Sequence, residues 1–299
     1  MFKSKLKIII NYLLAIFNLK IVNSIKSGPF DLTNKDYNFF TSQYLFDNHQ
    51  FIINIDLSIG RTNNWFIMSN DSLDPPIFAI REALKKNLTS DTFYSDILST
   101  LKEHRSLTTF SNAGEFLDLE PDFDENLKKY PWWAEVNPWD NHTFDDQIKN
   151  FPYEVKKNRE RNGMQIISDD PDEIIRLDLE DSLPSHAMQY SKLTEKIRKN
   201  GFQYGGAYGY VTAEILIANN QIRWKPGREG NHRVAAASAL GLKNIPVLVT
   251  KVIRLEELEY WPNVINGTFK EDQATKIFYN IFEARPSKIH QKWIKKKSH

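Results

Sequence analysis

Residues 227–249 read GREGNHRVAAASALGLKNIPVLV, a glycine-containing turn followed by a helical pattern and an apolar run. Alanine and leucine favour the helix, Gly241 would end it, and the run from Ile245 to Val249 predicts a strand. A turn that opens a helix leaves the first backbone N–H groups without partners, and these attract anions together with the positive end of the helix dipole. The stretch therefore predicts an anion-binding turn at the start of a helix.

The turn offers several residues for holding a phosphate group. His232 and Arg233 lie where a charged ring and a forked guanidinium would add donors to an anion held by the backbone. An ordinary capped helix would show the same short pattern, so the neighbouring elements have to decide between a binding site and a cap. The candidate binding residues are Gly227, Gly230, Asn231, His232 and Arg233.

The elements before the turn follow a specific order. Ile174–Leu179 is strand-like and is followed by a connection through Pro184. An amphipathic helix comes next, and Gly201 after basic residues in the last turn predicts where it ends. Asn219 and Asn220 then separate two apolar runs, which predicts a β-hairpin.

This succession of strand, helix, hairpin, glycine turn, helix and strand resembles the ParB/sulfiredoxin superfamily. Gly230, Arg233 and Ala236 match the Gly-x-x-Arg-x-x-Ala motif of that superfamily, and a Leu-Gly pair before a Pro-Val strand matches as well. The resemblance covers residues 164–254. It implies an α+β fold class, with a nucleotide-binding domain between an N-terminal mixed α/β extension and a C-terminal helical tail, residues 255–299.

Two kinds of relative differ from this chain in their chemistry. In sulfiredoxin a cysteine precedes the His-Arg pair, whereas this chain has Asn231 there and contains no cysteine. Sulfinic-acid repair by that route is therefore excluded, as are disulfides and thiolate metal sites. In ParB partition proteins a DNA-reading domain follows, whereas residues 255–299 are too few for it and the formal net charge is only +1.

The third kind of relative is the free-serine-kinase type, in which the turn holds a nucleotide phosphate and an acidic residue near the first strand deprotonates a small hydroxyl substrate. This resemblance implies a kinase that uses ATP or ADP, with Mg²⁺ shared between the phosphates and a carboxylate. Phosphoryl transfer needs mainly positioning and charge neutralisation, so a small set of residues is sufficient. The implied catalytic residues are Glu180 or Asp181 as the base with His232 and Arg233, and Asp178 is the candidate metal ligand.

Other interpretations of these residues stay open. In one alternative, the carboxylates of Asp178, Glu180 and Asp181 have no catalytic role and only cap the connection after the strand or face water. A non-catalytic nucleotide-binding switch, with CTP or ATP as ligand, would use the phosphate contacts to order flanking helices and expose an interface. A ParB-like nuclease or DNA-binding protein is a further alternative, although 39 basic and 38 acidic residues give no overall attraction to nucleic acid.

Residues 1–25 are an apolar stretch flanked by lysines. The run from Ile8 to Phe17 is shorter than the ~20 residues of a transmembrane helix, and no small-residue cleavage site follows it. We expect a helix that packs on the body of a cytoplasmic protein, with peripheral contact to a membrane surface as the alternative.

Residues 26–163 form the expected extension, with its boundary near Gly163. One or two strands are predicted between Asn48 and Ile67, and two helices after Asp74. From Tyr130 onward, prolines argue against a long regular element. The tryptophans of this segment either form a stacking surface for a sugar or base or pin down an irregular segment.

The tail, residues 255–299, is expected to be helical and basic. Apolar residues recur at helical spacing from Ala274 to Phe282. A lysine cluster follows at residues 292–297, which would contact phosphates or lipid, or would simply keep the end of the chain soluble.

Overall fold

In a computed structural model of the chain, the contacts between residues divide it into two units, Met1–Phe51 and Ile52–His299. The helix expected at residues 1–25 and the boundary expected near Gly163 lie outside the described residues. The structure describes residues 28–35, 37–45, 49–86, 90–108, 111–119, 125–161 and 168–298.

The first unit contains a short strand, β1 (Phe30–Asp31), and a helix, α2 (Phe39–Leu45). The backbone N–H of Phe30 donates to the carbonyl of Gln50 at 2.9 Å, which pairs β1 with the residue that precedes the next strand. The ring of Phe39 lies 6.4 Å from that of Phe51, so α2 packs against the last residue of this unit.

Four strands, β2, β5, β3 and β4, lie next to one another in that order in a mixed sheet. The hairpin of β3 and β4 is antiparallel, and Asn219 and Asn220 between them both have positive φ, 51° and 58°, as a tight I′-type turn requires. β5 runs parallel to β3, so the sheet combines both strand directions. The predicted hairpin, strand and α+β class are thereby confirmed. The strands are β2 (Phe51–Asp56), β3 (Thr212–Ala218), β4 (Gln221–Pro226) and β5 (Asn244–Arg254).

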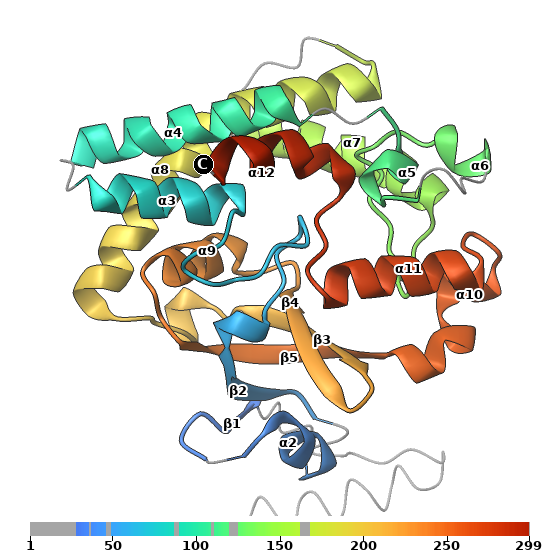
Figure 1. The fold of residues 1–299 in the computed structure, drawn as a ribbon, viewed down its shortest axis with the longest axis horizontal. Helices are drawn as coiled ribbons and strands as arrows, with labels where there is room; N and C mark the ends of the chain where they lie inside the picture. Colours follow the sequence, from blue (N-terminus) through green and yellow to red (C-terminus); the bar gives the residue numbers. More distant parts are fainter. Residues whose placement is uncertain are drawn as a thin grey trace, which may run out of the picture. The chain divides into compact units, whose positions relative to one another are not determined.

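Helices make up most of the second unit (Figure 1). The two helices predicted after Asp74 and the one predicted in the tail are present as α3, α4 and α11. The longer helices are α3 (Pro75–Lys85), α4 (Ser90–Leu107), α7 (Phe144–Arg161), α8 (Pro171–Asn200), α9 (Asn231–Ala239), α11 (Glu271–Phe282) and α12 (Gln291–Lys297). The short ones are α5 (Ala113–Phe116), α6 (Glu125–Lys128), α10 (Pro262–Ile265), and the 3₁₀ turns η1 (Leu57–Ile59), η2 (Gly206–Tyr208), η3 (Leu255–Tyr260) and η4 (Lys288–His290).

The strand predicted at Ile174–Leu179 is wrong, because this segment lies inside the 30-residue helix α8. The side chain of Asp170 caps the helix by accepting from Asp172 N at 3.1 Å, and Pro171 occupies the first helical position, where its missing N–H does no harm. Pro184 lies within the helix instead of in a connection. The predicted end is correct: Gly201 follows α8 with φ 71°.

The segment after Tyr130 also differs from its prediction, because α7 is a long helix in spite of Pro152 inside it. The tryptophans that precede α7 are mostly used in packing. Trp133 and Trp139 are 6% and 3% exposed, and the Trp139 ring meets Trp261 edge-on at 5.2 Å. These two side chains therefore anchor an irregular segment to the core.

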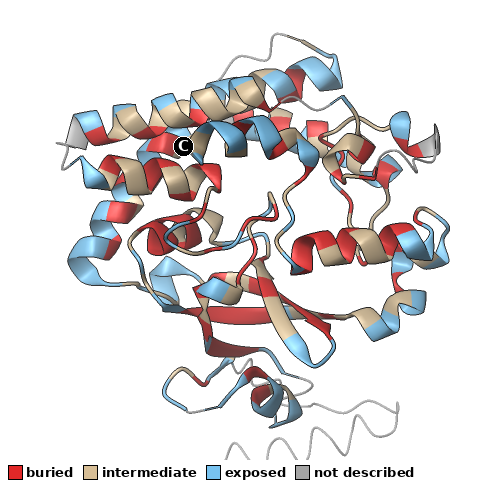
Figure 2. Ribbon diagram, in the orientation of Figure 1, coloured by how far each residue is buried: buried red, intermediate tan, exposed pale blue. Residues whose placement is uncertain are grey.

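Two apolar clusters hold the second unit together (Figure 2). In one, Ile277 and Phe278 of α11 pack with Leu216 of β3 and Ile253 of β5. In the other, the alanines of α9 pack with Ile77 of α3 and with α8. Alanine side chains allow the backbone of α9 to approach these neighbours closely, so α9 lies between the sheet and the helices α3, α4 and α8 (Figure 1).

The basic tail is docked on the body. Trp293 of α12 is fully buried, and its Nε1 donates to the carbonyl of Leu73 at 2.7 Å. Lys296 and Lys297 form ion pairs with Glu103 of α4 at 2.8 and 2.7 Å. Part of the lysine cluster therefore helps to attach α12. In the described part of the chain, the helices are too short or too polar to cross a membrane.

A buried histidine pair predicts that the fold weakens in acid. His104 Nε2 lies 3.3 Å from His290 Nδ1, and burial lowers the pKa of these rings from 6.5 to about 3 and about 4, respectively. Between these pH values the unfolded chain binds protons on the two rings that the folded chain does not bind. The free energy of unfolding therefore falls as the pH decreases from about 6.5 to about 4. The slope is up to about 1.4 kcal/mol per pH unit and histidine.

Urea unfolding across this pH range tests the expectation. His290→Phe should flatten the pH dependence, because one titrating ring is lost, whereas His142→Gln, outside the pair, should leave the slope as it is. Equal slopes in the wild type and in His290→Phe would contradict this account.

Candidate functional site

The glycine turn is built as the sequence predicts, with Gly230 as the residue before α9 at φ 97°. A Cβ atom at this position would lie 2.7 Å from Cγ2 and 2.9 Å from Cα of Val211, so both the backbone angle and the close approach require glycine. Glycine has no side chain that caps the helix, and the first N–H groups of α9 are left to an external acceptor. The start of α9 is therefore suited to an anion.

A cavity of about 490 Å³ opens at this turn and is called the α9 cavity below. Its polar lining includes three cations, Lys196, Arg228 and Arg233, and one carboxylate, Glu229. Its walls come from the last turns of α8, the segment after α8 and the start of α9. The excess of positive charge adds to the helix dipole and favours a phosphorylated ligand.

Two of the predicted turn residues are fixed by hydrogen bonds to backbone carbonyls. Arg233 Nη1 donates to the carbonyl of Gly209 at 3.2 Å, and burial lowers the pKa of Arg233 while Glu229 opposes that effect. A guanidinium stays protonated at neutral pH even so. Asn231 Nδ2 donates to the carbonyl of Gly227 at 3.3 Å, so Gly227 acts by orienting Asn231 and does not line the cavity.

His232 differs from its expected role. Its ring lies 5.1 Å from that of His186 and 4.7 Å from that of Tyr190. Burial, reinforced by His186, lowers the pKa of His232 to about 4, so the ring is neutral near pH 7. His232 can therefore donate a hydrogen bond to a ligand, while the positive charge of the cavity comes from Lys196, Arg228 and Arg233.

A second, smaller cavity of about 160 Å³ shares one lining residue, Asn231, with the α9 cavity. We call it the Asp74 cavity. Among the described residues of its lining, Asp74 is the charged side chain, and the other polar side chains are neutral amides and hydroxyls. Apolar residues such as Ile77 and Val234 complete its wall. The polar lining consists of Thr62, Asn63, Asn64, Asp74, Tyr190 and Asn231.

Asp74 is a functional candidate that the sequence did not reveal. Its side chain is 3% exposed, and it accepts hydrogen bonds from Thr62 and from Asn64 Nδ2, the latter at 3.4 Å. Burial raises the pKa of Asp74 from 3.8 to about 6 in spite of these bonds. A carboxylate with this pKa is ionised at neutral pH and still basic enough to accept a proton. In the sequence, Asp74 before two prolines signalled only the start of a helix.

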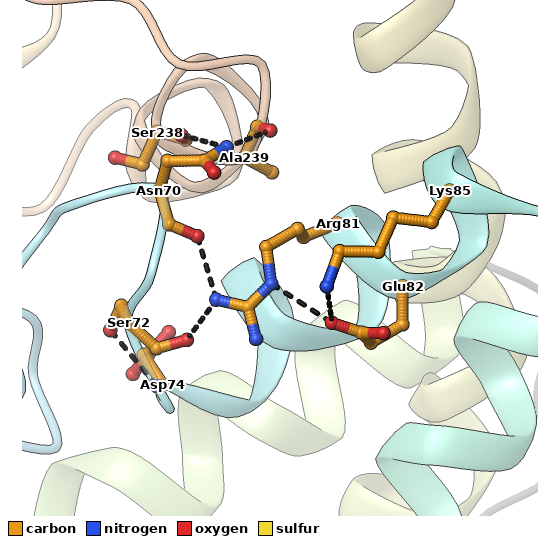
Figure 3. A network of polar contacts seen from close by, with 8 residues as sticks. All are labelled: Asn70, Ser72, Asp74, Arg81, Glu82, Lys85, Ser238 and Ala239. Carbon is orange, nitrogen blue, oxygen red and sulfur yellow. Dashed lines mark hydrogen bonds and ion pairs between the residues drawn. The ribbon is translucent and has the colours of Figure 1, made fainter.

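The loop that carries Asp74 is tied to the far end of α9 (Figure 3). Asn70 Nδ2 donates to the carbonyl of Ala239 at 2.6 Å, at the C-terminal end of that helix. Arg81 Nη1 donates to the carbonyls of Asn70 and Ser72 at 2.7 and 3.0 Å, and Asp74 N donates to Ser72 Oγ at 3.0 Å. The helix that presents the turn and the loop that presents Asp74 are therefore held as one assembly.

The structure places the predicted base residues elsewhere. Glu180 and Asp181 line a third cavity of about 820 Å³, which they share with Trp132. Glu180 pairs with Arg176 at 3.2 Å, and Asp181 pairs with the buried Arg159 at 2.8 Å. These carboxylates lie in the first half of α8, whereas the second half of the same helix lines the α9 cavity.

The predicted metal ligand, Asp178, also lies outside the α9 cavity. Its carboxylate is 3.6 Å from Arg159, and burial raises its pKa while Arg159 and His186 oppose the change. Over the described ranges, no group of three His, Cys, Asp or Glu side chains is arranged to hold a metal ion.

Comparisons with known proteins found no match for this chain. No protein-family model matches it, and no match was found among curated proteins or among solved structures. The interpretation of the site therefore depends on its residues and their geometry.

The raised pKa of Asp74 predicts an unusual effect on stability. Because the folded-state pKa, about 6, exceeds the unfolded value, protonated Asp74 stabilises the fold in acid, and this contribution is lost as the pH rises through about 6. Above that pH the buried charge is a cost. Asp74→Asn should therefore raise the free energy of unfolding at about pH 7.5 by on the order of 1–3 kcal/mol.

Urea unfolding of wild type and variant measures this difference, which should shrink toward zero near pH 4. Asp71→Asn, an exposed carboxylate in the same loop, is the matched control and should change little. A destabilised Asp74→Asn at about pH 7.5 would show that the carboxylate is held mainly by its hydrogen bonds.

Proposed function

We propose that this chain is a nucleotide-dependent phosphotransferase that moves one phosphoryl group to a small uncharged hydroxyl compound. The α9 cavity would hold the donor phosphates, and the Asp74 cavity would hold the acceptor. The observation that carries the proposal is the position of Asn231, which lines both cavities. A phosphate on the first N–H groups of α9 would then border the space that contains Asp74.

The donor side supplies charge neutralisation. The start of α9, Arg233 and Lys196 converge on one cavity, and such donors stabilise the charge that spreads over a phosphoryl group during transfer. Glu229 is the carboxylate in the lining, and its oxygen chemistry fits Mg²⁺, which proteins usually bind through one or two carboxylates and the substrate phosphates. Bound there, the ion would neutralise further phosphate charge.

The acceptor side supplies a base. Asp74 would take the proton of the acceptor hydroxyl while the oxygen of that hydroxyl forms a bond to the terminal phosphorus of the donor. The bond from that phosphorus to the bridging oxygen breaks, and its electron pair leaves with the shortened nucleotide. Neutral hydroxyls and amides, such as those of Thr62, Asn64 and Tyr190, would orient the acceptor.

The lining also restricts the acceptor. No lysine or arginine is among the described residues of the Asp74 cavity, so a free carboxylate or phosphate on the acceptor would meet only Asp74 and neutral groups. A volume of about 160 Å³ suits a molecule of a few carbon atoms. We therefore favour a small polyol over a hydroxy acid. The likeness of Gly230, Arg233 and Ala236 to the ParB/sulfiredoxin motif supports the nucleotide part of this proposal, although the first strand expected from that resemblance is part of α8.

Nucleotide binding is tested by thermal unfolding with ATP, ADP, GTP and CTP in the presence of Mg²⁺. A ligand at about 100 times its Kd should stabilise the wild type by about 2.7 kcal/mol. Arg233→Ala should lose most of this effect, whereas Arg198→Ala, an exposed change at the end of α8, should keep it. If no nucleotide raises the Tm of the wild type, the proposed ligand class is wrong.

Turnover is tested by transfer of labelled phosphate to a pool of small polyols, with hydroxy acids of the same size as comparison. Asp74→Asn should lower kcat by about 10²–10⁴-fold without weakening nucleotide binding. The wild-type rate should fall as the pH drops through about 6, where Asp74 becomes protonated.

Two outcomes would contradict the assignment in different ways. A loss of turnover in Glu180→Gln but not in Asp74→Asn would return the base to the position predicted from the sequence. Nucleotide binding without transfer to any acceptor would instead favour a non-catalytic nucleotide-binding switch.

A further inference from the structure

We propose that the nucleoside part of the donor stacks on the ring of Tyr208, which makes the site selective for nucleotides over inorganic polyphosphates. This inference rests on the proposed phosphate site. Tyr208 lines the α9 cavity together with the turn residues and with Phe202. Tyr208 is 46% exposed, so the cavity contains an aromatic surface that the fold covers only in part.

A single exposed aromatic residue is common on protein surfaces and needs no function. Tyr208 differs because a fixed backbone presents it. Gly205 N donates to the carbonyl of Gly209 at 2.9 Å, and Tyr208 N donates to the carbonyl of Gly205 at 3.0 Å, so the segment 205–209 closes on itself. Gly205, Gly206 and Gly209 have φ of 74°, 51° and 62°, a region that other residues rarely adopt.

This closed loop is joined directly to the phosphate turn. Arg233 Nη1 donates to the carbonyl of Gly209 at 3.2 Å, so the cation that would meet a phosphate also holds the residue next to Tyr208. Lys196 Nζ lies 4.6 Å from the centre of the Tyr208 ring, and both residues line the same cavity. Charge for the phosphates and a ring for a flat apolar group are therefore available within one cavity of about 490 Å³, a usual size for a small-ligand site.

The combination points to a nucleoside phosphate. A nucleobase presents a flat face to an aromatic ring, and such stacking tolerates any base because every base has a π-face. An inorganic polyphosphate offers nothing to the ring. Gln189 and Gln203 also line the cavity, and their amides supply polar partners for the edge of a base.

The experiment compares the affinities of ATP and inorganic tripolyphosphate, both with Mg²⁺, by titration calorimetry on the full chain. The two ligands share a phosphate chain, so their ratio isolates the nucleoside. Wild type should bind ATP about tenfold or more tightly than tripolyphosphate. Tyr208→Ala should bring ATP to within about twofold of tripolyphosphate and leave tripolyphosphate unchanged, because only the stacking partner is lost.

Tyr208→Phe, which keeps the ring, should retain the preference. Tyr153→Ala removes a more exposed tyrosine on α7, outside the α9 cavity, and should behave as wild type. Far-UV circular dichroism of each variant checks that the fold is intact.

The other outcomes are separable. Equal affinity of the wild type for both ligands would overturn the inference and leave the phosphate site standing. Equal weakening of both ligands by Tyr208→Ala would also overturn it, because the loop would then act only on Arg233. Failure of the wild type to bind either ligand would overturn the phosphate site as well.

Discussion

The contact of the glycine turn with the first residues of β3 is the constraint on which the site depends. Gly230 approaches Val211 so closely that no side chain fits, and Thr212 N donates to the carbonyl of Glu229 at 3.1 Å while Gly227 N donates to the carbonyl of Thr212 at 2.9 Å. Leu248 N of β5 in turn donates to the carbonyl of Val211 at 2.8 Å. The direction in which the first N–H groups of α9 point is thus set by the sheet.

The C-terminal end of α9 is held by hydrogen bonds from the loop that carries Asp74. The amide of Asn70 donates to the carbonyls of Ser238 and Ala239 at the last turn of the helix, where the negative end of its dipole lies. Because the same loop continues through Ser72 to Asp74, a polar contact that completes a helix also fixes the carboxylate. Trp293 adds to this by donating to the carbonyl of Leu73, so residues from three distant parts of the sequence position Asp74.

What the sequence could predict here was local. The turn, α9, the Asn219-Asn220 hairpin and the end of α8 at Gly201 all depend on the preferences of neighbouring residues, and all are correct. Asp74 was missed because its significance arises from burial in one cavity with Asn64 and Tyr190. Tyr190 is distant in the sequence, and Asn64 is an ordinary turn residue until the fold places it beside Asp74. The strand expected at Ile174–Leu179 failed because buried isoleucines suit a strand and a helix equally, and the cap at Asp170 and Pro171 decided between them.

The sharing of Asn231 between the two cavities has a consequence for the order of chemical events. Because this residue borders both subsites, the proposed transfer needs no protein group to carry the phosphoryl moiety from one to the other. Under the proposed function, donor and acceptor would have to be present together, and kinetics would be sequential, without a phosphorylated enzyme. A single in-line displacement inverts the configuration at phosphorus, so direct transfer between the two cavities that Asn231 borders would give a product of inverted configuration.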